Sequence, residues 1–129
     1  MAFSMSRNHA SFDYVYSNGQ TSMIFVPLLK NASFRNRFLQ RLAYHCRVTF
    51  QRENVLRVFE PLVEAVEGEV PRNTARWDYE PNSFRLNIQR IRTRIVDYDR
   101  PMELIRDISH RLSLTEAEQN RYFGDLLHE

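Results

Sequence analysis

The sequence is poor in cysteine, glycine and lysine. Its 129 residues include one cysteine, three glycines and a single lysine, Lys30. A lone Cys46 cannot form an internal disulfide, which excludes a small disulfide-stapled scaffold. The three glycines stand far apart, so the glycine-rich loop that cradles nucleotide phosphates is also excluded.

Long hydrophobic runs are missing as well. The longest apolar stretch, residues 23–29, is too short to cross a bilayer and contains Pro27. The first twenty residues hold no apolar segment of the length that a secretory signal needs. The sequence therefore predicts neither a membrane span nor an export signal, and leaves the cytoplasm as the default compartment.

The residues that are present describe an ordinary globular chain. Hydrophobic residues make up 43% and charged residues 26%, and the length suits one domain with its own core. The net charge is only +2, although all basic residues except Lys30 are arginine. Arginines could bind nucleic acid, but such surfaces need excess charge clustered on one face. The composition favours a solvated, paired surface over a nucleic-acid partner.

Residues 1–20 are expected to form an irregular leader. They are polar, with a turn signal at residues 17–19. Aromatic residues argue against complete disorder, and they could dock on the helical body or on another part of a larger protein. These aromatics are Phe3, Phe12, Tyr14 and Tyr16.

Helical periodicity dominates residues 21–129, which are expected to form one domain. Apolar residues recur at spacings of three and four, and no strand alternation follows residue 26. The predicted fold is all-α, a bundle of about six helices. The expected helical ranges are 22–30, 31–48, 49–67, 83–96, 99–112 and 115–127, with a short helix at 71–76.

Several residues predict where these helices begin and end. The expected N-caps are Asn31 or Ser33, Asn82 and Asp99, and Thr115 with Glu118 forms a capping box. Gly68 is the expected C-cap of the 49–67 helix. Pro61 should kink that helix or end it near Phe59.

Side-chain patterns also predict packing. One buried stripe is expected at Phe34, Phe38, Leu39, Leu42, Ala43 and Cys46, and the last helix should bury Ala117, Phe123, Leu126 and Leu127. Trp77 is interpreted as an anchor between helices. Glu64 and Glu67 are expected beside Arg35 and Arg37, because short connections make neighbouring helices antiparallel.

No constellation of residues predicts catalysis, and no catalytic, cofactor-binding or metal-binding residue is assigned. The histidines, at positions 9, 45, 110 and 128, lack metal-site spacing. His45 and Cys46 are adjacent, so on a helix their side chains diverge, and Cys46 is interpreted as a core residue. Asp97 and Asp99 resemble a fragment of a cation site, but capping of the next helix explains Asp99. Lys30 is interpreted as a solvated helix-end residue, and Asp13 has no identifiable partner.

One family resemblance adds to this reading. The segment PLLKNASFRNRF is followed by a helix, by the run VLRVFEPLVEAVEGEVPRNTARW, and later by Arg100-Pro101. This pattern resembles the CotH kinase family, the spore-coat protein H type of atypical kinase, over about 100 residues. The residues that carry the resemblance are Leu28, Leu29, Asn31, Phe34, Arg35, Phe38, Arg76, Trp77, Arg100 and Pro101.

The resemblance implies an ATP- and Mg-dependent serine kinase as the parent family. The family's nucleotide lysine and metal-binding aspartates lie upstream of the matched region, so none carries over to this chain. The chain is then expected to be a non-catalytic C-terminal helical subdomain whose partner is the upstream catalytic part. The alternatives are a helical interaction or oligomerisation module without a kinase role, with another protein or a second copy as partner, and a nucleic-acid binder.

Overall fold

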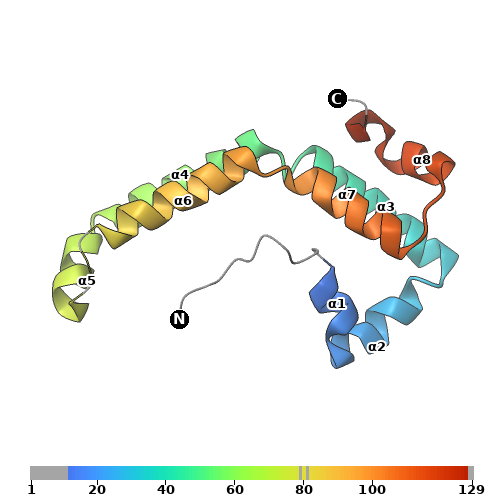
Figure 1. Cartoon of the computed structure of the whole chain (residues 1–129), viewed down its shortest axis with the longest axis horizontal. Helices are drawn as coiled ribbons and strands as arrows, with labels where there is room; N and C mark the ends of the chain where they lie inside the picture. Colours follow the sequence, from blue (N-terminus) through green and yellow to red (C-terminus); the bar gives the residue numbers. More distant parts are fainter. Residues whose placement is uncertain (1–11, 79, 81, 128–129) are drawn as a thin grey trace. The chain divides into compact units, whose positions relative to one another are not determined.

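The computed structural model describes residues 12–78, 80 and 82–127 (Figure 1). These residues contain eight α-helices and no strand, which confirms the all-α prediction. They divide into two compact units. Unit 1 comprises the described residues of Met1–Arg47 and Arg100–Glu129, and unit 2 comprises those of Val48–Asp99.

Unit 1 contains five helices and unit 2 contains three. The helices of unit 1 are α1 (Asp13–Ser17), α2 (Gly19–Leu28), α3 (Ala32–Arg47), α7 (Arg100–Arg111) and α8 (Glu116–Leu127). Those of unit 2 are α4 (Arg52–Glu67), α5 (Val70–Trp77) and α6 (Ser83–Asp97). No helix of the described residues is long and apolar enough to cross a membrane.

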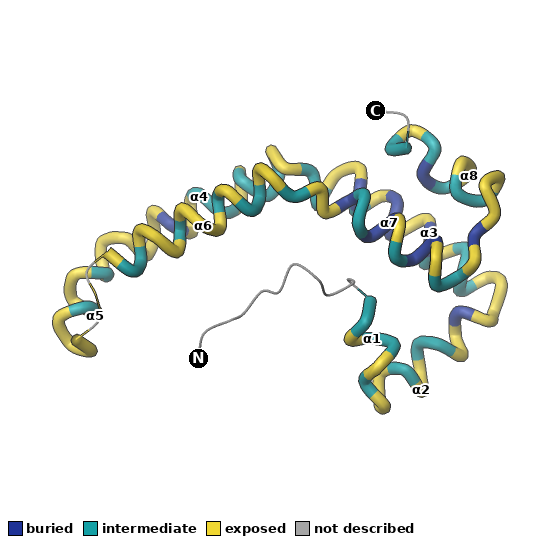
Figure 2. Tube along the Cα trace, viewed as in Figure 1, coloured by how far each residue is buried: buried dark blue, intermediate teal, exposed yellow. Residues whose placement is uncertain are grey.

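The core of unit 1 lies where α3, α7 and α8 pack on one another, and Figure 2 shows buried positions gathered on α3 and α7. The expected stripe on α3 is confirmed for Leu39, Leu42, Ala43 and Cys46, all of which are buried, whereas Phe34 and Phe38 of the same stripe are only half-buried. From the other elements the core receives Leu29, Leu104, Ile105, Ile108, Leu114 and Phe123.

The C-terminal segment differs from the prediction in three details. Ala117 is exposed, because it precedes Phe123 by six residues and therefore points about 120° away from it around the helix. Leu126 and Leu127 were expected to be buried but are only half-buried. Leu114 is buried although it was not expected in the core. It follows Ser113, whose positive φ of 48° turns the chain after α7, and its N–H donates to the Ser109 carbonyl at 2.9 Å.

Two predicted helix starts are confirmed by their hydrogen bonds. Asn31 Oδ1 accepts from the Phe34 N–H at 3.0 Å at the start of α3. In the capping box of α8, Thr115 N–H donates to Glu118 Oε2 at 2.9 Å and Glu118 N–H donates to Thr115 Oγ1 at 3.3 Å. Asn82 occupies the N-cap position of α6 but makes no side-chain capping bond.

In unit 2, α4 and α6 lie side by side and run antiparallel (Figure 1). Helix α4 continues through Pro61 to Glu67, so no boundary occurs near Phe59. Val63 is the one buried hydrophobic residue among the described residues of this unit. Trp77 was expected to be an anchor between helices, but it is 59% exposed and ends α5 beneath the Arg76 guanidinium. That prediction was wrong.

Part of the expected leader is helical and docked. Helix α1 and the start of α2 fall within residues 1–20, which had been expected to be irregular. Phe12 packs edge-on against Phe38 at 6.1 Å, and Tyr16 against Phe25 at 6.3 Å between ring centroids. Docking on the body is therefore confirmed for these two aromatics. Phe3 lies outside the described residues.

Candidate functional site

The residues that the sequence brought forward do not converge. Cys46 is fully buried as a core residue, as predicted, and its thiol lies 3.9 Å from the Pro101 carbonyl oxygen. The His45 ring contacts the neighbouring Tyr44 ring at 5.4 Å. Lys30, Asp97 and Asp99 are exposed. Within the described part of the chain, no group of three or more potential metal ligands comes together.

Arg111 organises a polar cluster in unit 1. Its Nε donates to Asp107 Oδ1 at 2.7 Å, and its Nη2 pairs with Asp13 of α1. The same guanidinium lies 4.6 Å from the centre of the Tyr16 ring. Asp107 also accepts the Phe12 N–H at 2.7 Å. This cluster holds α1 against α7 and gives Asp13 the partner that the sequence did not reveal.

The environment of Tyr16 follows from this docking. Burial raises the pKa of the Tyr16 phenol, and the Asp107 carboxylate adds to that effect, while the Arg111 guanidinium opposes it. The phenolate is thus disfavoured in the folded chain. Tyr16 acts here as a neutral packing group and cation–π partner.

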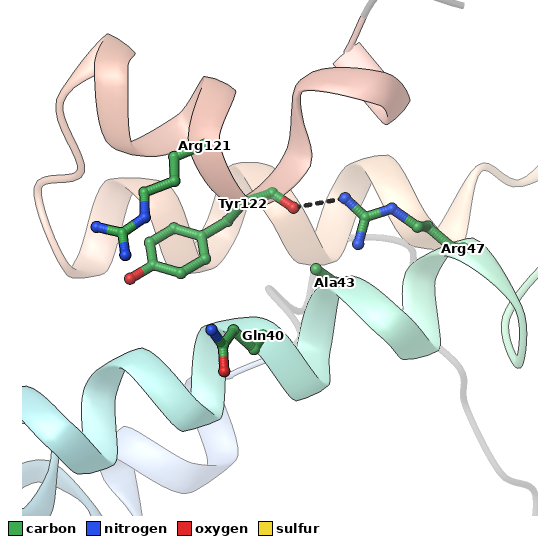
Figure 3. A pocket seen from close by; sticks show the side chains of 5 residues that line it. All are labelled: Gln40, Ala43, Arg47, Arg121 and Tyr122. Carbon is green, nitrogen blue, oxygen red and sulfur yellow. Dashed lines mark hydrogen bonds between the residues drawn. The ribbon is translucent and has the colours of Figure 1, made fainter.

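An open hollow of about 220 Å³ lies between α3 and α8 (Figure 3). It is lined by Gln40, Ala43 and Arg47 of α3 and by Arg121 and Tyr122 of α8. The Arg47 guanidinium donates to the Tyr122 carbonyl at 2.7 Å and forms a bidentate pair with Asp125. Arg121 extends over the Tyr122 ring at 5.4 Å. One lining arginine is therefore already neutralised by a carboxylate.

The polar contacts beside this hollow fasten α8 to α3. Tyr122 Oη donates to Asn36 Oδ1 at 2.7 Å, and Arg35 pairs with Glu118 at 3.3 Å. The bond from Arg47 lowers the pKa of the Asp125 carboxyl. Hydrogen bonds from the Thr115 backbone and side chain lower the pKa of Glu118. The arrangement is a structural seam that joins α8 to α3.

The charge pairing predicted from the sequence was wrong. Arg35 was expected beside Glu64 and Glu67, but it pairs with Glu118. Glu60 pairs with Arg92 of α6, through two bonds of 2.8 and 2.6 Å. That pair lowers the pKa of the Glu60 carboxyl. Sequential neighbours were assumed to pack, whereas α3 packs on α7 and α8, and α4 packs on α6.

Exposed apolar surface is the more distinctive feature. On α2, Met23 is 77% and Ile24 68% exposed, while Phe25 packs against Phe34 and Phe38. On α4, three residues spaced by four are about half exposed or more: Val58, Leu62 and Val66. Apolar side chains left open in this way typically mark binding surfaces.

Sequence reasoning missed the residues that make these surfaces. By spacing alone, Leu62 and Val66 continue one apolar face of α4 with Val55, Leu56, Phe59 and Val63, yet both are at least half exposed. The signal that could have exposed the error was the width of that face. Apolar residues cover positions 55, 56, 58, 59, 62, 63 and 66, which is more of the helix circumference than one partner helix covers.

No family model matches the chain, and neither a curated protein nor a solved structure matches it. The candidate sites therefore rest on geometry alone. They are two separate exposed apolar faces, one on α2 in unit 1 and one on the α4–α6 pair in unit 2.

Proposed function

We propose that the chain is a non-catalytic helical subdomain of a CotH-like atypical protein kinase, in which it supports the part that binds ATP and metal. The observation that carries the proposal is the role of the resembling residues at the α2–α3 corner. Leu29 is buried, Asn31 caps α3, and Phe34 and Phe38 hold Phe25. The shared pattern thus corresponds to residues that shape one corner.

The face of α2 beyond that corner supports a docking role. Leu28, itself one of the resembling residues, is 41% exposed, and Met23 and Ile24 are more exposed still. The helix is apolar on nearly all sides, since residues 23–29 include no polar residue. A helix of this kind is normally covered on more than one side.

Two measurements test this proposal. First, isothermal titration of the chain with Mg-ATP should give no heat of binding, and incubation with labelled ATP should give no autophosphorylation. Tight nucleotide binding or autophosphorylation by the chain alone would refute a non-catalytic role.

Second, a CotH-family catalytic part, prepared as a separate polypeptide, should bind the chain and be stabilised by it. Ile24→Glu should abolish that binding because it places a charge on the apolar face of α2. Tyr44→Glu is the matched control, since Tyr44 is 53% exposed on α3. Equal binding by both variants would place the contact elsewhere, and no binding by the unmodified chain would count against the kinase relation.

A second candidate function is a helical interaction module without a kinase role. It is favoured by the α4–α6 face, which is exposed independently of the α2–α3 corner. Light scattering at high protein concentration tests one form of this function, oligomerisation, because an oligomer must give a mass above that of one chain.

A further inference from the structure

The α4–α6 pair has two sides with different chemistry. On one side, the bidentate pair between Glu60 and Arg92 bridges the two helices. Each residue of an α-helix turns about 100° from the last. Relative to buried Val63, Leu62 therefore lies on the side away from Glu60. By the same rotation, Ile91 points about 100° away from Arg92 around α6.

Because the two helices are antiparallel, these positions meet on a common face. Val58, Leu62 and Val66 follow one another at intervals of four along α4 and are 53%, 62% and 50% exposed. Ile91 of α6 is 42% exposed. The ridge on α4 is about 12 Å long, since eight residues separate its ends. We call Val58, Leu62, Val66 and Ile91 the apolar face of unit 2.

The charges around this face are unequal. The acidic residues of α4, including Glu53, Glu60, Glu64 and Glu67, lie on the opposite side by helical rotation. Towards the outer edge of α6 the charged residues are Arg90 and Arg94. Arg90 donates to the neutral amide of Asn87 at 3.4 Å, and Arg94 lies over the Tyr98 ring at 5.6 Å. The edge of the face is therefore basic.

We propose that the apolar face of unit 2 binds an amphipathic helix of a partner protein that carries acidic side chains along the edge facing Arg90. A row of apolar residues at intervals of four is the ridge that packs into the groove of another helix. A carboxylate on that helix would meet the guanidinium of Arg90. The inference rests on α4 and α6 alone, and it is independent of the kinase-related proposal.

A second copy fits this face less well. If two copies met through the same face, each would bring apolar residues and arginines, and no carboxylate would reach Arg90. The acidic side of α4 could instead meet the apolar face of another copy, but such head-to-tail contacts tend to continue into open chains. Charge complementarity therefore favours a different, acidic partner.

The test uses the full chain and two designed helical peptides of about 20 residues, which span about 30 Å. Both carry the same leucine stripe, flanked in one peptide by glutamate and in the other by lysine. Fluorescence anisotropy should show binding of the glutamate peptide at least about tenfold tighter than that of the lysine peptide. Amide chemical shifts of the labelled chain should change along α4 and α6.

Variants locate the contact. Leu62→Glu should weaken binding of the glutamate peptide by about tenfold or more, whereas Val96→Glu should leave it within about twofold. Val96 is the matched control because it is 45% exposed on α6 and lies one turn from Arg92, on the side of the helix away from Ile91. Arg90→Glu should weaken the glutamate peptide and strengthen the lysine peptide. Circular dichroism checks that each variant keeps its helix content.

Several results would overturn the proposal. Equal affinity for both peptides would show that the face has no charge preference. An affinity that Leu62→Glu does not change would show that binding does not use this face. Absence of binding to either peptide would also refute the proposal. A dimer in light scattering that Leu62→Glu disrupts would assign the face to a second copy instead.

Discussion

Units 1 and 2 are both helical, yet they bury their apolar residues to very different degrees. Unit 1 holds ten of the buried hydrophobic residues of the described chain, and unit 2 holds only Val63. Conversely, eight of the exposed large hydrophobics belong to unit 2 and five to unit 1. The difference has a geometric cause. Helices α3, α7 and α8 pack mutually, whereas the extensive helix contact of α4 among the described residues is with α6.

An amphipathic pattern does not by itself ensure that the apolar face of a helix is buried. Helix α4 carries an apolar face as clear as that of α3, but a face is buried only as far as neighbouring helices cover it. Two helices in contact share one seam, and the remaining apolar width stays open to water. Unit 2 therefore combines helix-forming sequence with little core, which is the condition expected of a surface that binds a partner.

The largest expected contrast is between two leucines. Leu39 of α3 is 1% exposed and Leu62 of α4 is 62% exposed. Leu39→Ala should lower the free energy of unfolding by about 2–5 kcal/mol, because it removes buried methyl groups and leaves a cavity. Leu62→Ala should change it by no more than about 0.5 kcal/mol. Urea unfolding followed by circular dichroism measures both free energies. Equal losses in the two variants would contradict the difference in burial between the two units.

A smaller loss is expected when the docking of α1 is broken. Arg111→Ala removes the partner of Asp13 and leaves the largely buried Asp107 without its guanidinium. The cost should be about 1–3 kcal/mol, as for other unsatisfied buried polar groups. Amide hydrogen exchange should speed up in α1, with little change in α4 and α6. Arg106→Ala on the exposed side of α7 is the control, and slow exchange in α1 after Arg111→Ala would contradict the role of the cluster.

Acidification should weaken the α3–α8 seam. The pKa values of Glu118 and Asp125 are lowered in the folded chain, so their contribution is present above the ordinary pKa of about 4 and is lost as pH falls through the lowered values. The thermal midpoint should therefore fall as pH drops below about 5. Glu118→Gln should flatten this dependence, and Glu69→Gln should not. A midpoint independent of pH in this range would refute the seam's contribution.

The smallest effect on stability is expected at Trp77. Because the side chain is 59% exposed, Trp77→Phe should change the free energy of unfolding by no more than about 0.5 kcal/mol. Trp77 is the only tryptophan, so its fluorescence reports on α5 alone. Acrylamide should quench it readily in the folded chain. Strong protection from acrylamide would restore the interpretation of Trp77 as a buried anchor.

Much of the fold follows from local sequence. The spacing of apolar residues identifies the longer helices, Asn31 caps α3, and the capping box of Thr115 and Glu118 starts α8, because these features involve residues only three or four apart. Helix α1 escaped prediction since Phe12 and Asp13 at its start are held by Phe38 and Arg111, which lie far along the chain. No local pattern records such contacts.

The sequence by itself determined an all-α chain, the placement of Cys46 in a core, and the absence of a recognisable catalytic motif in its residues. Only the tertiary structure decided which apolar faces are covered. It joined Arg35 to Glu118 and Glu60 to Arg92, and it left Leu62, Val66 and Trp77 exposed. The physical reason is that periodicity fixes the direction of a side chain around its own helix, whereas its burial depends on which other helix packs against that face.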